Sequence, residues 1–455
     1  MDKRTKNFMV VALLAVMFVS ELNTIAAVIM ADLVKLFPDA SMTAIQMVMQ
    51  FGMIGTFPVT LCIGFFTNKF RIKPMICIGL CLILVGGLLP LAFHSSLGQL
   101  YLSAIMIGMG QGFMAPLVST LTLRHFENKP RERQIGFNAA SSSAGAALFT
   151  VLAGVLALSG WLNIYFLYFF AVPALILVIV FMPLGEKPVP VPQEKKEKTP
   201  VPARAFVLAL FLIMMFIGYV AFPLNIGILV DAEGIGDSAS TGLAISVITI
   251  VGVVLGLVFP FIVKVVKSFV GAFTCIFGVA GMAVVVVADS MAMIFVAAVL
   301  VGVFFGMAVA GSVYIVGRMC SPQQFAPALS IVLGLLYLGV ILCPIVVNGI
   351  TAMWGGEGAR AAFITSAGIM CVVTVAQLIW GFWIKKNFPE KAEGADSEPA
   401  DEVLDATGTA DAIATTATTD ATDTIATAEN TVASAENTVD NAVDSAEKAA
   451  DKLDQ

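Results

Sequence analysis

The stretch "GEKPVPVPQEKKEKTPVPAR", Gly185–Arg204, is polar, proline-rich and charged, and it divides a chain that is otherwise mostly apolar. Of the 455 residues, 59% are hydrophobic and only 12% are charged. On each side of this stretch, apolar runs of about 20 residues recur, and a run of that length can cross a hydrocarbon core as a helix. We therefore predict an all-α integral membrane protein in which this stretch is a solvated loop.

Six apolar runs precede the loop and six follow it, which predicts twelve transmembrane helices. We expect them at residues 8–30, 42–66, 74–93, 97–120, 134–157 and 162–183, and then at 205–230, 239–263, 269–288, 292–314, 326–350 and 361–384. The expected organisation is a six-helix half at 1–184, the loop at 185–204, a second six-helix half at 205–388 and a tail at 389–455.

The two halves also share a pattern of residues. The segments Gly108–Gly112 and Gly302–Gly306 each begin and end with glycine, and Arg124 and Arg318 follow them at the same offset of 194 residues. A duplicated six-helix unit is typical of transporters in which two pseudo-symmetric halves rock around a site near the bilayer midplane.

The basic residues indicate an orientation. Up to residue 389, 20 of the lysines and arginines fall in segments on the side of the N-terminus, and only Lys35 and Arg360 fall on the other side. Since cytoplasmic loops carry an excess of Lys and Arg, we expect a multi-pass protein of the cell membrane with both termini in the cytoplasm.

The tail differs in composition from the rest of the chain. From Glu390 onward it holds 17 acidic residues and three lysines. Apolar or small residues recur every seven positions at Ile425, Val432, Val439, Ala446 and Leu453, which is a weak heptad pattern. The tail is therefore either disordered or a weak helix that pairs with a partner.

Glu21, in "FVSELNTIA" (residues 18–26), is the one acidic residue that we place deep in a span. A carboxyl at that depth is costly and normally faces a cavity. Because no Lys or Arg lies deep in any span to pair with it, desolvation favours the neutral acid, and opening to water allows it to ionise. Glu21 could carry a proton, pair with a cationic or hydroxylated substrate, or be a permanently protonated structural acid.

Polar and aromatic side chains in the spans are candidates for the wall of a central substrate cavity. They are Asn23, Thr24, Gln50, Gln111, Ser142, Tyr219, Ser246, Thr249 and Tyr337. For any one of them, packing between helices is an alternative role.

The six-plus-six layout and the segment "GFFTNKFRIK" together resemble the major facilitator superfamily, whose pattern in this segment is Gly-x-x-x-Asp-Arg-x-Gly-Arg-Lys. Gly64 and Lys73 match, Lys69 replaces the first arginine, Arg71 replaces the second glycine and Asn68 replaces the aspartate. The resemblance implies that this loop latches a cytoplasmic gate.

The first five spans look most like the drug-efflux branch of that family, with degenerate motifs. The expected arginine of span 4 is Ala104, and of the glycine-rich antiporter motif of span 5 only Gly145 is present. We therefore expect a secondary transporter that works by alternating access, is coupled to protons and exports an apolar or weakly cationic solute. The alternatives are a proton symporter or facilitator for metabolite uptake, and a sensor or scaffold that acts through the tail.

The sequence favours no enzyme. It has no nucleotide-binding loop and no metal-ligand cluster, and His94 and His125 lie at span ends. We expect no metal and no cofactor, and as partners a small-molecule substrate, protons and the lipid bilayer but no nucleic acid.

Overall fold

A computed structural model describes residues 3–126, 128–182 and 202–388 of the chain. Throughout this described part the regular structure is helical, and it contains no strand. The tail at 389–455 and nearly all of the loop expected at 185–204 lie outside the described residues.

The first six spans contain nine helical elements. The first span is built from α1 (Lys3–Ser20), the 3₁₀ segment η1 (Glu21–Ile29) and α2 (Met30–Leu36). The next four are α3 (Met42–Lys69), α4 (Ile72–Ala92), α5 (Leu97–His125) and α6 (Asn128–Ala157). The sixth combines the 3₁₀ segment η2 (Trp161–Phe170) with α7 (Ala171–Phe181).

The second six spans are α8 (Ala203–Ala232), α9 (Ser238–Val266), α10 (Val270–Val286), α11 (Met291–Met319), α12 (Pro322–Met353) and α13 (Gly358–Asn387), with a short 3₁₀ turn, η3 (Lys267–Phe269), between α9 and α10. In the described residues, 11 helical segments are long and apolar enough to cross a membrane, and one of them, Ser238–Val286, has 49 residues. A crossing needs about 20 residues, so this segment provides two crossings, and the total is twelve.

The two groups of helices pack in the same order, as expected of pseudo-symmetric halves. In the first half α5 packs on α3 and α4, α7 packs on α1 and α4, and α6 packs on α1. In the second half α11 packs on α9 and α10, α13 packs on α8 and α10, and α12 packs on α8. The glycines paired in the sequence occupy matching contacts, since a Cβ on Gly112 of α5 would meet the Thr56 oxygen of α3 and one on Gly306 of α11 would meet the Gly252 oxygen of α9. The predicted all-α membrane fold is therefore confirmed.

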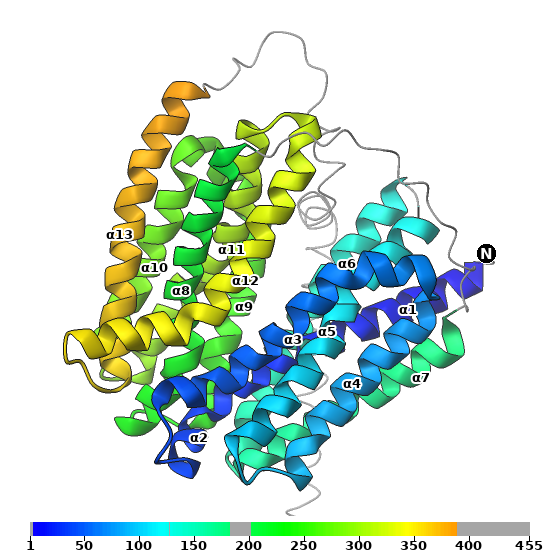
Figure 1. Cartoon of the computed structure of the whole chain (residues 1–455), viewed down its shortest axis with the longest axis horizontal. Coiled ribbons are helices and arrows are strands. Elements are labelled where there is room, and N and C mark those ends of the chain that lie inside the picture. The colour runs from blue at the N-terminus through cyan, green and yellow to red at the C-terminus, as the bar shows by residue number, and fades with distance from the viewer. Residues whose placement is uncertain (1–2, 127, 183–201, 389–455) are drawn as a thin grey trace, which may run out of the picture.

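The halves approach each other at one end of the bundle and diverge toward the other, where α1 begins and α13 ends (Figure 1). We call the first the closed end; it holds Thr43, Asn225 and Asn348. We call the second the basic end; it holds the turn between α3 and α4 and the end of α13.

The exposed fractions of side chains along one face of α3 show this divergence. At about 100° per residue, Gln46, Gln50, Phe57 and Leu61 share an arc of about 60°. The first two are 1% and 0% exposed, whereas Leu61, nearer the basic end, is 66% exposed. The face of α9 that contacts α6 changes in the same way, from Ser246 at 2% to Phe261 at 67%. Each half therefore covers the facing helix of the other half only toward the closed end.

Candidate functional site

The Glu21 carboxyl lies where α1 gives way to η1 and is half-buried. Ser142 of α6 donates a hydrogen bond to Glu21 Oε1 over 2.9 Å. Thr24 donates to the Glu21 backbone oxygen at 2.8 Å, and its hydroxyl lies 3.4 Å from that of Thr150. Within the described residues, no basic side chain forms an ion pair with Glu21. The first span thus presents a carboxyl among hydroxyl groups rather than beside a cation.

The 3₁₀ geometry of η1 distinguishes this part of the first span. The segment has nine residues, whereas 3₁₀ runs beyond about four are uncommon and often mark a hinge. Tyr168 of η2 donates to the Leu22 oxygen at 3.4 Å and so partners one of the carbonyls of this segment. The sequence pattern had indicated only a continuous span here.

The second half faces this site through α12. Tyr337 lies near enough to Glu21 for the two groups to interact electrostatically, and its ring centroid is 6.1 Å from that of Phe57 on α3. Both aromatic residues are half-buried. Of the candidate cavity residues, Thr24, Ser142 and Tyr337 are therefore the ones that the fold gathers around Glu21.

Tyr219 lies in an aromatic cluster of the second half. Its ring stacks on Phe305 at 5.2 Å and on Phe304 at 5.8 Å. Ser246 of α9 donates to the Ala147 oxygen of α6 at 2.9 Å, so it joins the two halves directly. Thr249, one turn further along α9, is half-buried. Tyr219 and Ser246 therefore have packing partners of their own.

Three candidate amides carry buried atoms without hydrogen-bond partners. Gln50 is fully buried and neither of its amide atoms is paired, while Asn23 Nδ2 and Gln111 Oε1 are also unpaired. Asn23 packs against Gly52, where an added Cβ would lie 2.7 Å from its side-chain oxygen. Since an unpaired buried polar group costs about 1–3 kcal/mol, these amides are sites at which a solute or water would be favourable.

A polar network at the closed end was not among the expected site residues. Gln46 of α3 donates to Asn225 Oδ1 of α8 at 2.8 Å and accepts from Asn348 Nδ2 of α12 at 2.9 Å. Asn348 Nδ2 also donates to the Thr43 hydroxyl oxygen at 3.1 Å. The polar side chains at 46, 225 and 348 are visible in the sequence, but no local sequence pattern indicates that residues so far apart are hydrogen-bonded to one another.

The expected gate segment from Gly64 to Lys73 is mostly helical. α3 continues to Lys69, so only Phe70 and Arg71 connect it to α4. Lys73 donates to the backbone oxygens of Ile179 at 2.8 Å and Met182 at 2.6 Å, and so caps the end of α7 within its own half. The loop is shorter than expected because α3 and α4 extend toward each other; Gly64 and Asn68 belong to the last turns of α3.

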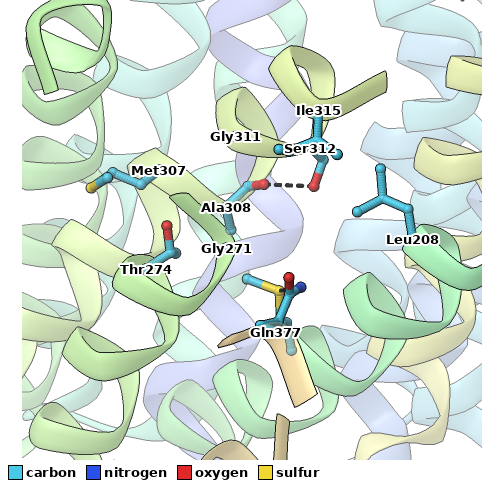
Figure 2. A pocket seen from close by; sticks show the side chains of 10 residues that line it. Leu208, Gly271, Thr274, Met307, Ala308, Gly311, Ser312, Ile315 and Gln377 are labelled. Carbon is cyan, nitrogen blue, oxygen red and sulfur yellow. Dashed lines mark hydrogen bonds between the residues drawn. The ribbon is translucent and has the colours of Figure 1, made fainter. Parts of the chain in front are cut away.

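A small cavity lies inside the second half, among α8, α10, α11 and α13 (Figure 2). Gln377, Thr274 and Ser312 contribute its polar atoms, and its volume is about 10 Å³. A volume of this size holds about one water molecule. It is therefore too small for an organic solute. In the described residues, no three His, Cys, Asp or Glu side chains lie close enough to hold a metal ion.

Comparisons with known proteins agree with this architecture. The family model of the Major Facilitator Superfamily matches residues 8–309 and 267–422. The nucleoside transporter NupG superposes with a TM-score of 0.64 at 16% identity, over 84% of this chain and 99% of that one. The POT family transporter PepTSo superposes with a TM-score of 0.68 at 10% identity, over 85% of this chain and 99% of that one.

A third similar structure is a bacterial homologue of the human lysosomal transporter Spinster, in an inward-facing and unoccupied conformation. It has a TM-score of 0.64 and 14% identity, and the match covers 85% of this chain and 98% of that one. No sequence among curated proteins matches significantly. At these identities the solved structures establish the fold.

Proposed function

Because this chain belongs to the Major Facilitator Superfamily, we propose that it is a secondary active transporter that moves a small organic solute by alternating access and couples the movement to protons through Glu21. One observation carries this proposal: a half-buried carboxyl lies midway along a span, with Ser142 as hydrogen-bond donor and no cationic partner in the described residues. Such a group can change protonation as its surroundings change from dry to wet.

The divergence of the halves supports alternating access. The shared face of α3 is buried at Gln46 and exposed at Leu61, so the interface between the halves opens toward the basic end. If that end is cytoplasmic, as the excess of basic residues favours, the conformation is inward-facing in a cell membrane and both termini are cytoplasmic. Protonation and solute binding would then both occur from the cytoplasm in this state.

The groups around Glu21 favour an apolar or weakly cationic solute. A carboxylate that interacts with Tyr337, whose ring lies 6.1 Å from that of Phe57, combines charge attraction with a surface for cation–π and apolar contact. We therefore favour efflux of such a compound, in line with the resemblance of the first five spans to drug exporters.

A second candidate is proton-coupled or facilitated uptake of a polar metabolite. The unpaired amides of Gln50 and Asn23 favour it, because a solute with its own donors and acceptors would satisfy them. Among the similar structures is a nucleoside transporter, which is compatible with a polar solute.

The test is a proton-flux measurement in proteoliposomes that contain the purified full-length protein and a pH-sensitive dye in the lumen. Candidate solutes of both classes are added to wild type and to Glu21→Gln. The control is Glu357→Gln, which makes the same chemical change at an exposed position just before α13. We expect a solute-dependent flux that Glu21→Gln abolishes and Glu357→Gln retains.

Other outcomes separate the remaining roles of Glu21. Solute uptake that persists without proton flux in both wild type and Glu21→Gln would make Glu21 a structural acid and contradict coupling. Loss of solute binding in Glu21→Gln, with no solute-dependent flux in wild type, would assign the carboxyl to the solute alone.

A further inference from the structure

Two glutamines one turn apart on α3 have opposite hydrogen-bonding situations in the same interface. Gln46 is 1% exposed, and both ends of its amide are paired with residues of the second half, Asn225 and Asn348. Gln50 is 0% exposed and neither end of its amide is paired. Closing the halves therefore gives the Gln46 amide its hydrogen bonds and leaves the Gln50 amide without any.

Gln50 lies on the face of α3 that contacts the second half. It lies about 40° around α3 from Gln46, and Phe57 lies about 20° from Gln46, all on one face. Gln46 touches α8 and α12, and Phe57 touches Tyr337 of α12. The side of α3 that packs on α5 is a different one, where Gly52, Gly55 and Thr56 meet the α5 backbone. Gln50 thus stands between two contacts with the second half.

We propose that Gln46 and Gln50 set the equilibrium of the gate at the closed end in opposite directions, with Gln46 favouring the closed gate and Gln50 favouring the open one. When the halves separate at this end, the three amides of the Gln46 network exchange protein partners for water. The same opening gives the Gln50 amide its first hydrogen bonds. Two opposed contributions from one helix face keep either state from being too stable for a transport cycle.

Water is the alternative explanation for Gln50, and the network limits it. A buried water needs a polar site with two to four partners. Along this face of α3 the nearest polar side chain is Gln46, and both ends of its amide are already paired. The other neighbours on the helix, Met53, Ile54 and Phe57, are apolar. A water at Gln50 would have to share the Gln46 amide with Asn225 and Asn348, whereas opening of the gate exposes the Gln50 amide to bulk water.

The experiment measures how often the closed end opens. Gly227 of α8 is a suitable reporter position because a Cβ there makes only ordinary contacts, 3.4 Å from Thr241 and 3.7 Å from the Val28 oxygen of the other half. It lies two residues from Asn225 and is buried. Gly227→Cys is introduced into a full-length protein whose seven native cysteines are replaced, and its labelling rate by a maleimide is measured in nanodiscs without solute.

We expect Gln50→Leu to slow the labelling and Gln46→Leu to accelerate it, each by about fivefold or more. Removing an unpaired buried amide, or leaving its partners unpaired, shifts the equilibrium between the open and closed gate by about 5- to 150-fold. The matched control is Gln377→Leu, because Gln377 is also buried, at 5% exposed, but lies inside the second half, at the cavity of Figure 2. It should leave the labelling rate unchanged.

A second route tests the network if Gln46→Leu folds poorly. Asn348→Ala removes the other partner of the same hydrogen bond and should accelerate labelling alike. In the double variant the two effects should add only in part, because both variants remove the same Gln46–Asn348 hydrogen bond. Correct folding is checked by a monodisperse elution profile and an unchanged circular dichroism spectrum.

The proposal is overturned if Gln50→Leu labels as fast as wild type or faster, or if Gln377→Leu slows labelling as much as Gln50→Leu does. It rests on the alternating access proposed above but not on Glu21. The assay contains no solute and no pH gradient, so a failure of proton coupling leaves its outcome unaffected.

Discussion

Gly108 of α5 lies directly against the backbone of Gly52 of α3, so that a Cβ on Gly108 would overlap the Gly52 carbonyl. Thr56 reinforces the same crossing by donating to the Gly108 oxygen at 3.0 Å. Small residues allow helices to approach this closely in a membrane, where packing rather than the hydrophobic effect holds them together.

We expect Gly108→Ala to destabilise the first half by about 1–3 kcal/mol, since the added methyl meets backbone that cannot rotate away. The measurement is the thermal unfolding midpoint in detergent. Gly256→Ala in α9 is the control, because nothing lies within 4 Å of its added Cβ. Gly256→Ala should be neutral or slightly stabilising, as alanine is the better helix former. Equal midpoints for both variants would contradict the close packing.

Lys73 caps α7 through the Ile179 and Met182 oxygens, a role within one half. Removing it in Lys73→Met leaves two carbonyls at a helix end without their charged donor, and cations near a helix C-terminus contribute about 0.3–1 kcal/mol. We therefore expect a small fall in the unfolding midpoint and partial rescue by Lys73→Arg. In the Gly227→Cys labelling assay Lys73→Met should match wild type. A large change in labelling would instead support the gate role that the family resemblance implies.

Lys35 of α2 and Asp231 of α8 form an ion pair of 2.6 Å between the halves, with side chains 62% and 42% exposed. Exposed pairs contribute about 0–1 kcal/mol. We expect Lys35→Ala to accelerate labelling at the closed end by less than the loss of Gln46 does, and the difference from wild type should vanish in 1 M salt, where the Debye length is about 3 Å. An effect as large as that of Gln46→Leu, or one insensitive to salt, would contradict this ranking.

Much of this architecture can be predicted from periodicity and charge. The central polar stretch, the twelve apolar runs and the repeated glycines indicated two similar halves, and the glycines do lie at helix crossings, as Gly112 on Thr56 shows. Local composition suffices for such features because a span in lipid must be a helix.

The partners across the bundle could not be predicted in this way. Ser142 meets Glu21 across 121 positions and Asn348 meets Gln46 across 302, and no local pattern encodes either pairing. The extent of α3 was also underestimated, because charged residues near Lys69 resemble a loop, whereas a helix end outside the hydrocarbon can carry them. The 3₁₀ segment η1 has no composition that marks it off from an ordinary helix.

Acid should reveal a further interaction at the closed end. Two hydrogen bonds from the Arg360 guanidinium, one of them 2.8 Å to Oε1, lower the pKa of Glu233 below its usual 4.5, and Glu233 lies between α8 and α9, outside the spans. Because the folded-state pKa is the lower one, the stabilisation is present above about pH 4.5 and is lost as the pH falls through the folded-state pKa.

We therefore expect the unfolding midpoint of wild type to fall between pH 5 and pH 3 more steeply than that of Glu233→Gln, with the two differing most near neutral pH. The pair is partly exposed, so the effect should be modest. Asp237 accepts from the Ser240 backbone nitrogen at 2.8 Å and has a lowered pKa for that reason. It titrates in the same direction in both proteins, so it cancels in the comparison. If the unfolding midpoints of wild type and Glu233→Gln changed in parallel with pH, the charge on Glu233 would contribute no stability through Arg360.

Removal of residues 390–455 distinguishes a transporter from a sensor or scaffold that acts through its tail. The groups around Glu21 and the network at the closed end are built wholly from residues before 389. We therefore expect the truncated protein to retain solute-dependent flux in proteoliposomes within about twofold and to label at Gly227→Cys at the wild-type rate. A tail of the same length with its 17 acidic residues replaced by their amides serves as the control for length alone. If truncation abolished flux while the unfolding midpoint stayed the same, the tail would belong to the transport cycle, and the scaffold interpretation would gain the support that the body of the protein does not supply.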